Sequence, residues 1–204
     1  MQDYQITDLD QLLALYGEVP TGAVTKERTS LHPMHQDLIA ASPLCAFATV
    51  GPDGTDCTPR GDEPGFVRVV DEHTLELPDR KGNNRLDSLR NIVADGRCSL
   101  LFVIPHRIDT MRVNGRAIIT TDPTTLASHA IDGKAPATVI RITVEAAYLQ
   151  CGKAMIRSKL WDPSSCPAVD GLPTPGQLSA AFRDGVDVTE YDAGYEMSLR
   201  ENLL

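Results

Sequence analysis

Several features that would assign this chain to a common protein class are missing. No run approaches the roughly 18 consecutive apolar residues that a membrane-spanning helix needs. The first residues, MQDYQITDLDQLLALYG, carry acids early and no basic segment before a long apolar core, so we expect no signal peptide. Positive charge is scarce, since 19 Lys and Arg stand against 28 Asp and Glu. The net charge of -9 argues against a broad surface for nucleic acid or anionic membranes.

Paired cysteines are also missing. The five cysteines are scattered and none has CxxC spacing, which predicts reduced thiols in a cytoplasmic protein and no metal site built from them. His32 and His35 have a spacing that permits a metal pair, but no third ligand accompanies them. We therefore expect this pair at the start of a helix, and no metal.

Three nucleotide and nucleophile motifs do not occur. The chain lacks GxxxxGK[ST] and GxGxxG, which excludes a P-loop and a Rossmann phosphate turn. It also lacks GxSxG, so nothing indicates the nucleophile of an α/β-hydrolase.

What the chain does have is a series of short strand-like runs. Most are apolar or alternating segments bounded by Gly, Pro and Asp turns, at 44–50, 57–65, 66–70, 74–78, 97–105, 110–120 and 138–151. In the last run, Ile140, Ile142, Val144 and Ala146 alternate with polar residues and are predicted to share one face. Six or seven strands with short links indicate an antiparallel barrel or sandwich with peripheral helices.

Helical patterns are few and lie mostly outside these runs. We expect helices at 7–16 with Thr7 as cap, at 33–41, 85–94 and 152–160, from Asp122, and at 174–182. The chain is then one domain, 1–204, with a helical N-terminal segment (1–42), a barrel (43–151) and a helical and irregular C-terminal extension (152–204).

One stretch, LPDRKGNNRLDSLRNI (77–92), gathers positive charge in an acidic chain. We read it as strand, loop and helix, with Asn83 or Asn84 as the helix cap and Arg85 and Ser88 in the first turn. A helix start attracts anions, and arginine offers a fork that matches phosphate oxygens. The stretch is either a phosphate or carboxylate site or a set of solvated charges beside an ordinary cap, and its local chemistry leaves both readings open.

Four segments together resemble the pyridoxamine 5'-phosphate oxidase-like flavoproteins. They are SPLCAFATVGPDGTDCTPRGDEPGFV, LPDRKGNNRLDSLRNI with the following GRCSLLFVIP, MRVNGRAIIT, and LQCGKAMIRSKLWDP, which is similar to a bacterial subgroup of uncharacterised members. The resemblance implies a mainly β fold with peripheral helices, an antiparallel six-stranded split β-barrel that binds FMN. Asn-Gly within RVNGRA favours a hairpin turn, whereas the resemblance runs a single strand through it with Gly115 at a bulge or a close backbone contact.

The resemblance also implies a cofactor site. It gives the FMN phosphate to Arg80, Asn84, Arg85 and Ser88, and it lays the flavin ring along two strand segments, Arg60–Asp62 and Leu77–Asp79. The residues of these segments are Arg60, Gly61, Asp62, Leu77, Pro78 and Asp79. The family forms homodimers with the flavin at the subunit interface, so Arg112, Asn114, Lys153 and Arg157 would complete the site from the partner chain.

The function implied is that of an FMN-binding flavoprotein, an oxidoreductase that transfers a hydride between flavin N5 and a small organic substrate or a nicotinamide. No catalytic residue is assigned. The alternatives are a non-catalytic flavin- or haem-type binding or sensor protein, and a deazaflavin-dependent reductase. The C-terminal end, EYDAGYEMSLRENLL, lacks the Trp-Arg-Leu-Pro-Arg-type motif of true pyridoxamine phosphate oxidases, which argues against that substrate.

Overall fold

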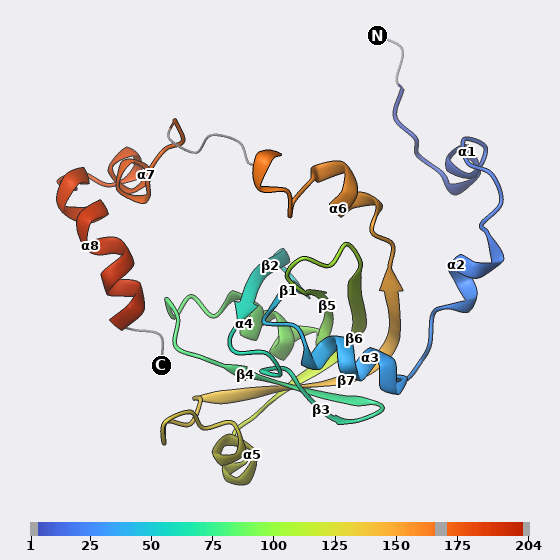
Figure 1. The fold of residues 1–204 in the computed structure, drawn as a ribbon, viewed down its shortest axis with the longest axis horizontal. Coiled ribbons are helices and arrows are strands. Elements are labelled where there is room, and N and C mark those ends of the chain that lie inside the picture. The colour runs from blue at the N-terminus through green and yellow to red at the C-terminus, as the bar shows by residue number, and fades with distance from the viewer. Residues whose placement is uncertain (1–3, 166–170, 202–204) are drawn as a thin grey trace.

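The centre of the fold is one antiparallel sheet. A computed structural model describes residues 4–165 and 171–201, and its seven strands follow the order β2-β1-β5-β6-β7-β4-β3 (Figure 1). The strands are β1 (Leu44–Gly51), β2 (Gly54–Gly61), β3 (Arg68–Asp71), β4 (Thr74–Asp79), β5 (Arg97–Val103), β6 (Thr110–Thr120) and β7 (Thr138–Gln150). Each strand pairs antiparallel with its neighbours.

The predicted fold class, mainly β with peripheral helices in a split barrel, is confirmed. The sheet has seven strands instead of six, because the four residues of β3 pair with β4 at one edge. Strands β2 and β3 form the two edges of the sheet and are not neighbours in its order, so the barrel stays open on one side.

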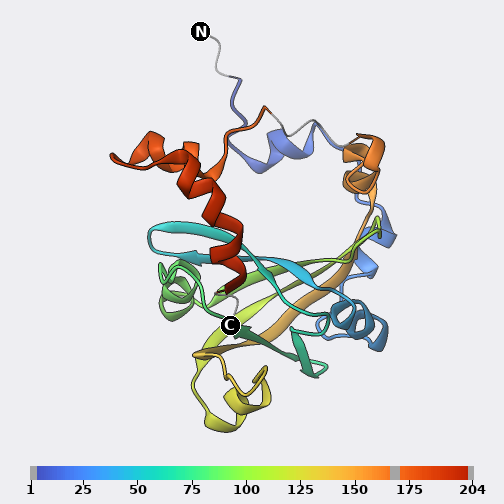
Figure 2. The same ribbon diagram turned by 60° about the vertical axis from the view of Figure 1, so that its left-hand side comes forward.

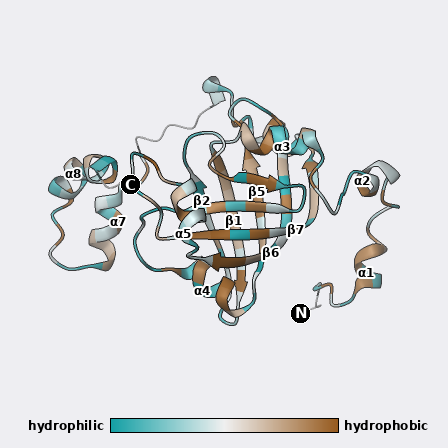
Figure 3. Cartoon of the chain, turned by 90° about the horizontal axis from the view of Figure 1, so that it is seen from below, coloured by the Kyte–Doolittle hydropathy of each residue, from teal (hydrophilic) through white to brown (hydrophobic). Residues whose placement is uncertain are grey.

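The inner face of the curved sheet forms the core. Phe47 of β1, Leu100 and Phe102 of β5, and Ile140 and Ile142 of β7 are fully buried there. Figure 3 shows apolar and polar residues alternating along the strands, as expected when one face is buried. Burying each such side chain contributes about 1.5–3 kcal/mol, so this face supplies most of the stability of the barrel.

A bulge lies in the middle of the two longest strands. MRVNGRAIIT forms one continuous strand, β6, so the bulge reading is confirmed and the hairpin reading is wrong. Asn114 pairs with Ala146 and Gly115 pairs with Val144, which leaves Glu145 as an extra residue in β7. The extra residue reverses the alternation, so Ala147 is buried and the predicted inward position of Ala146 is wrong.

The helices surround the barrel. They are α1 (Leu9–Leu13), α2 (Thr21–Thr25), α3 (Pro33–Ala40), α4 (Asp87–Ala94), α5 (Pro123–Ser128), α6 (Lys153–Ser158), α7 (Pro175–Phe182) and α8 (Val188–Glu201), with a short 3₁₀ turn, η1 (Pro163–Ser165). Helices α2 and α8 were not predicted. Figure 2 shows that α1, α2, α7 and α8 lie outside the barrel, and α7 packs against α8. In the described ranges no helix is long and apolar enough to cross a bilayer.

The helix caps differ in part from the expected ones. Asp122 and Thr174 cap α5 and α7 as predicted, but α1 is capped by Asp8 instead of Thr7. His32 caps α3, and His35 reaches back to the backbone N–H of His32. The two histidines therefore stand at the start of a helix, as expected.

Candidate functional site

A cleft of about 1040 Å³ opens at the edge of the barrel. Strand β2, the end of β4, the loop into α4 and the loop into β7 form its walls. Nine of the predicted cofactor residues line it: Arg60, Gly61, Leu77, Pro78, Asp79, Arg80, Asn84, Arg85 and Ser88. Leu77 points into the core and is buried, so its contribution to this surface comes from its backbone.

Two reciprocal ion pairs bridge the open side of the barrel. Arg60 Nη1 of β2 lies 2.9 Å from Asp79 Oδ1 at the end of β4. Arg80 Nε, one residue later, lies 3.0 Å from Asp62 Oδ2, just after β2. Strands β2 and β4 are not neighbours in the sheet, so side chains join them where backbone hydrogen bonds do not. Asp62 thus belongs to this arrangement through Arg80.

The start of α4 forms the second wall of the cleft. The helix begins at Asp87, and Leu86 stands at the N-cap position with φ 62° and no side-chain cap, so the predicted cap at Asn83 or Asn84 is wrong. Ser88 donates a 2.6 Å hydrogen bond to Asp56 Oδ2 and ties the helix to β2. A helix start without a side-chain cap leaves backbone N–H groups for a ligand.

The arginines around the cleft differ in burial. The side chain of Arg80 is 19% exposed. That of Arg85 is 75% exposed, and among the described residues its ion-pair partner is its near neighbour Asp87, at 2.8 Å. Arg80 is therefore fixed in place, and Arg85 stands at the rim and is free to reorient.

Positive charge exceeds negative charge locally. Among the described residues, five cations line the cleft (Arg60, Arg80, Lys81, Arg85 and Lys134), against the carboxylates of Asp56, Asp79 and Asp87 and that of Asp62 at its edge. The chain as a whole carries -9. The cleft therefore attracts anions although the molecule repels them.

Two buried polar atoms in the cleft wall lack a hydrogen-bond partner within the described chain. They are Arg60 Nε and Thr138 Oγ1, and both residues line the cleft. Buried polar groups are nearly always paired, so these two indicate that a polar ligand belongs here. A ligand with a flat ring and a phosphate tail fits these groups. The hydrogen-bond donors and acceptors of the ring would pair with the orphaned polar atoms on the strands, and the phosphate would lie against the cations at the helix start.

The remaining four predicted residues lie elsewhere. Arg112 and Asn114 are on the outer face of β6, and Lys153 and Arg157 are in α6; we call these four the far-end group. None of them lines the cleft of its own chain. Arg112 Nη1 donates to the Tyr148 hydroxyl at 3.0 Å, and the Ser99 hydroxyl donates to Asn114 Oδ1 at 2.8 Å. Asn114 also borders a second hollow of about 420 Å³.

Some cleft residues were missed from the sequence. Lys134 comes from the loop between α5 and β7, Thr138 is the first residue of β7, and Asp56 comes from β2. The sequence signal was weak, because a Gly-Lys turn before a strand is common. Within the described ranges no three His, Cys, Asp or Glu side chains gather as a metal site.

Comparison with known proteins identifies the fold. Residues 31–151, more than half of the chain, match the model of the pyridoxamine 5'-phosphate oxidase family. A search of curated proteins returns no significant match. Among solved structures, tagged HupZ from Group A Streptococcus is 22% identical with a TM-score of 0.50, over 59% of this chain and 94% of that chain.

Two further structures show more distant likeness. A Clostridium acetobutylicum protein related to general stress protein 26 of B. subtilis is 15% identical, with a TM-score of 0.44 over 56% of this chain and 84% of that chain. An FAD-binding protein from Mesorhizobium loti is 14% identical, with a TM-score of 0.40 over 61% of this chain and 98% of that chain.

Proposed function

Because this chain belongs to the pyridoxamine 5'-phosphate oxidase family, we propose that it is a flavoprotein and that the cleft between β2 and β4 holds FMN. One observation carries the proposal: the cation-lined cleft ends on one side at the uncapped start of α4 and on the other at two orphaned buried polar atoms. Phosphate suits the first side, and a ring that accepts and donates hydrogen bonds suits the second.

The roles of the residues follow from their positions. Arg85, Asn84 and the first turn of α4 would hold the phosphate, and Arg80 would add charge from its fixed position behind it. Arg60, Thr138 and the backbone of β4 would hold the ring. When bound, FMN supplies the redox chemistry by accepting or donating a hydride at N5. The side chains of the protein orient it and favour negative charge near N1.

The first experiment asks whether FMN binds. The purified protein should be yellow, and heat should release FMN instead of FAD or a deazaflavin. Arg85→Ala should weaken FMN binding at least tenfold, roughly the 1.5–3 kcal/mol of a charge-assisted hydrogen bond. Arg90→Ala is the matched control, since Arg90 is exposed on the same helix and does not line the cleft. A colourless protein that does not bind added FMN would falsify the proposal.

The second experiment separates an oxidoreductase from a carrier. We propose an oxidoreductase that acts on a small organic substrate or a nicotinamide. NADH or NADPH should reduce the bound flavin without oxygen, and air should reoxidise it. If no donor tested reduces the flavin, the protein is better described as a flavin carrier or sensor.

We further propose that the protein is a homodimer and that the far-end group of one chain completes the cleft of the other. The support is that these four residues lie outside the cleft of their own chain although the resemblance assigns them to the same cofactor. We also propose a cytoplasmic location, because Cys45, Cys57, Cys98 and Cys151 are unpaired thiols, while Cys166 lies outside the described residues.

A further inference from the structure

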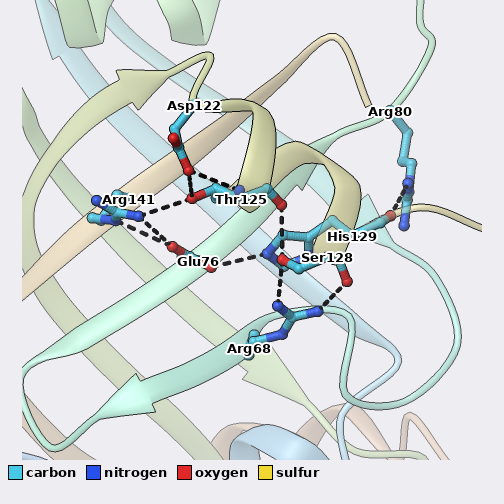
Figure 4. A network of polar contacts seen from close by, with 8 residues as sticks. All are labelled: Arg68, Glu76, Arg80, Asp122, Thr125, Ser128, His129 and Arg141. Carbon is cyan, nitrogen blue, oxygen red and sulfur yellow. Dashed lines mark hydrogen bonds and ion pairs between the residues drawn. The ribbon is translucent and has the colours of Figure 1, made fainter. Parts of the chain in front are cut away.

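A buried polar network lies behind the cleft, under α5 (Figure 4). Its centre is Glu76, which stands between two apolar residues of β4. Arg68 of β3 and Arg141 of β7 are its direct cross-strand neighbours. Glu76 Oε1 accepts hydrogen bonds from Arg141 Nε and Nη2 at 3.1 and 2.7 Å, and Glu76 Oε2 lies 3.1 Å from His129 Nε2.

The network is closed to solvent at its centre. The side chains of Glu76 and His129 are 6% and 4% exposed. Burial alone would raise the pKa of Glu76, but the bonds from Arg141 and His129 outweigh it and the pKa is lowered. Glu76 is therefore a buried carboxylate anion whose bonds hold its neighbours in one geometry.

This geometry fixes α5. The helix has six residues, too few to be stable alone. Arg141 Nη2 donates to Thr125 Oγ1 at 3.2 Å, and Arg68 donates to Ser128 O and Oγ at 2.6 and 2.7 Å. The ring of His129, just after the helix, is bonded to Glu76, so both ends of α5 are tied to the sheet.

The fixed helix end reaches Arg80 of the cleft. The carbonyl oxygen of His129 accepts a 2.9 Å hydrogen bond from Arg80 Nη1, while Asp62 accepts from Arg80 Nε. The guanidinium of Arg80 is therefore held by two acceptors, and one of them is set by the His129 ring through Glu76. The chain from α5 continues into Lys134–Thr138, which line the cleft.

We propose that Glu76 and His129 are positioning residues, which hold the His129 carbonyl against Arg80 and so fix the guanidinium of Arg80 in the cleft; this rests on the proposed FMN site. Neither residue touches the cofactor. Their effect on binding passes through Arg80.

The test is a double-mutant cycle read in two ways. His129→Leu removes the bond to Glu76, and His129→Gln keeps a donor near the position of Nε2. We expect His129→Leu to raise the Kd for FMN roughly fivefold, the effect of one lost hydrogen bond, and His129→Gln to restore most of the affinity. In an Arg80→Met background, His129→Leu should change the Kd no further.

A destabilised control separates positioning from general loosening. Val144→Ala shortens a buried side chain of β7 that takes no part in the network. It should lower the urea midpoint and leave the Kd for FMN unchanged. If Val144→Ala weakens binding as much as His129→Leu does, or if the effects of His129 and Arg80 on the Kd add, the positioning role is overturned.

The same cycle in urea, without flavin, distinguishes the two proposals. If the losses in the free energy of unfolding caused by His129→Leu and Arg80→Met do not add, the two residues are coupled, whatever ligand the cleft holds. If the coupling is present but the wild type does not bind FMN, the proposed function fails and the role at the flavin fails with it. If the wild type binds FMN and the coupling is absent, the positioning role alone fails.

Discussion

The outer face of the sheet has two polar areas that differ in what covers them. Under α5, Glu76 and His129 are buried and fully engaged by neighbours of their own chain. Beyond the bulge, Arg112 and Asn114 stand half-buried on the same face and bond to Tyr148 and Ser99. The same face of the sheet therefore stabilises the fold where a helix covers it and keeps polar side chains partly exposed to solvent where no helix of the described chain does.

The bulge that separates the two areas gives the largest expected effect. A Cβ on Gly115 would lie 2.0 Å from the carbonyl oxygen of Thr143. Gly115→Ala should therefore lower the free energy of unfolding by about 3 kcal/mol or more, because two backbones must separate. Urea unfolding measures the loss. Gly194→Ala in α8 is the control, since nothing lies within 4 Å of its added Cβ. Equal stability of the two variants would contradict the bulge geometry.

The covered area predicts a loss of stability in acid. Burial lowers the pKa of His129 below its usual 6.5, so the unfolded chain takes up a proton first and stability starts to fall near that pH. The pKa of Glu76 is lowered from 4.5 by the bonds that outweigh its burial, so its contribution persists at neutral pH and is lost only below that value. His35 contributes to the same first step, because burial lowers its pKa as well. His129→Gln should therefore shrink the first step and keep the second. Urea midpoints from pH 8 to pH 4 should show both steps in the wild type, and an undiminished step near 6.5 in His129→Gln would assign it to His35.

The open area gives a smaller effect, confined to binding. Arg112→Met should leave the urea midpoint nearly unchanged and weaken FMN binding about tenfold, or ~1.4 kcal/mol, if the far-end group serves the cleft of a second chain. Mixing Arg112→Met with Arg85→Ala chains should then restore one intact site in each hybrid dimer. Titration with FMN counts the restored sites. No recovery on mixing would place Arg112 outside a shared site.

The smallest expected effect is a difference in the reaction rates of the cysteine thiols, with no change in stability. Burial raises the pKa of Cys45 and of Cys98 to about 12, while Cys57 and Cys151 are exposed. The backbone N–H of Lys153 lowers the pKa of Cys151, and nearby positive charges add to this. In a Cys166→Ser background, a thiol reagent should therefore modify Cys151 first, Cys57 next, and the other two only in denaturant. If all four thiols react at the same rate in the native protein, the burial of Cys45 and Cys98 on the inner face of the sheet is contradicted.

Much of the fold was predictable, because strand runs and turn residues carry local signals. The positions of β1, β5 and β6 follow from apolar runs and glycine turns. The inward face of β7 was predicted correctly up to Val144 and wrongly at Ala146, because the extra residue Glu145 is defined by its register with β6. Register depends on a long-range pairing that period alone does not show.

The parts of the site whose residues lie close together in the sequence were predictable, and the parts built from residues far apart in the sequence were not. Residues of the stretch 77–88 and Arg60–Asp62 were placed together through the resemblance, and the structure brings them to one cleft or to its edge. The network around Glu76 was not predicted, because His129 lies 53 residues away and a single Glu in a strand has no distinctive pattern. Helix α8 was not predicted, because it contains Gly194 and because none of its residues is buried, so its sequence shows no clear apolar face.

Two residues before α4 have a consequence for how fast a ligand binds. Asn84 and Leu86 both have left-handed backbones, with φ 59° and 62°. This costs Leu86 about 1–2 kcal/mol and costs Asn84 less, because the short polar side chain of asparagine tolerates the conformation. The folded barrel maintains this shape through the bond from Ser88 to Asp56 and the bond from the Arg85 N–H to Asn83. The loop is therefore shaped before any ligand arrives and does not have to close over it. Association with an anion should be a single fast phase whose rate falls as salt screens the cations at the rim.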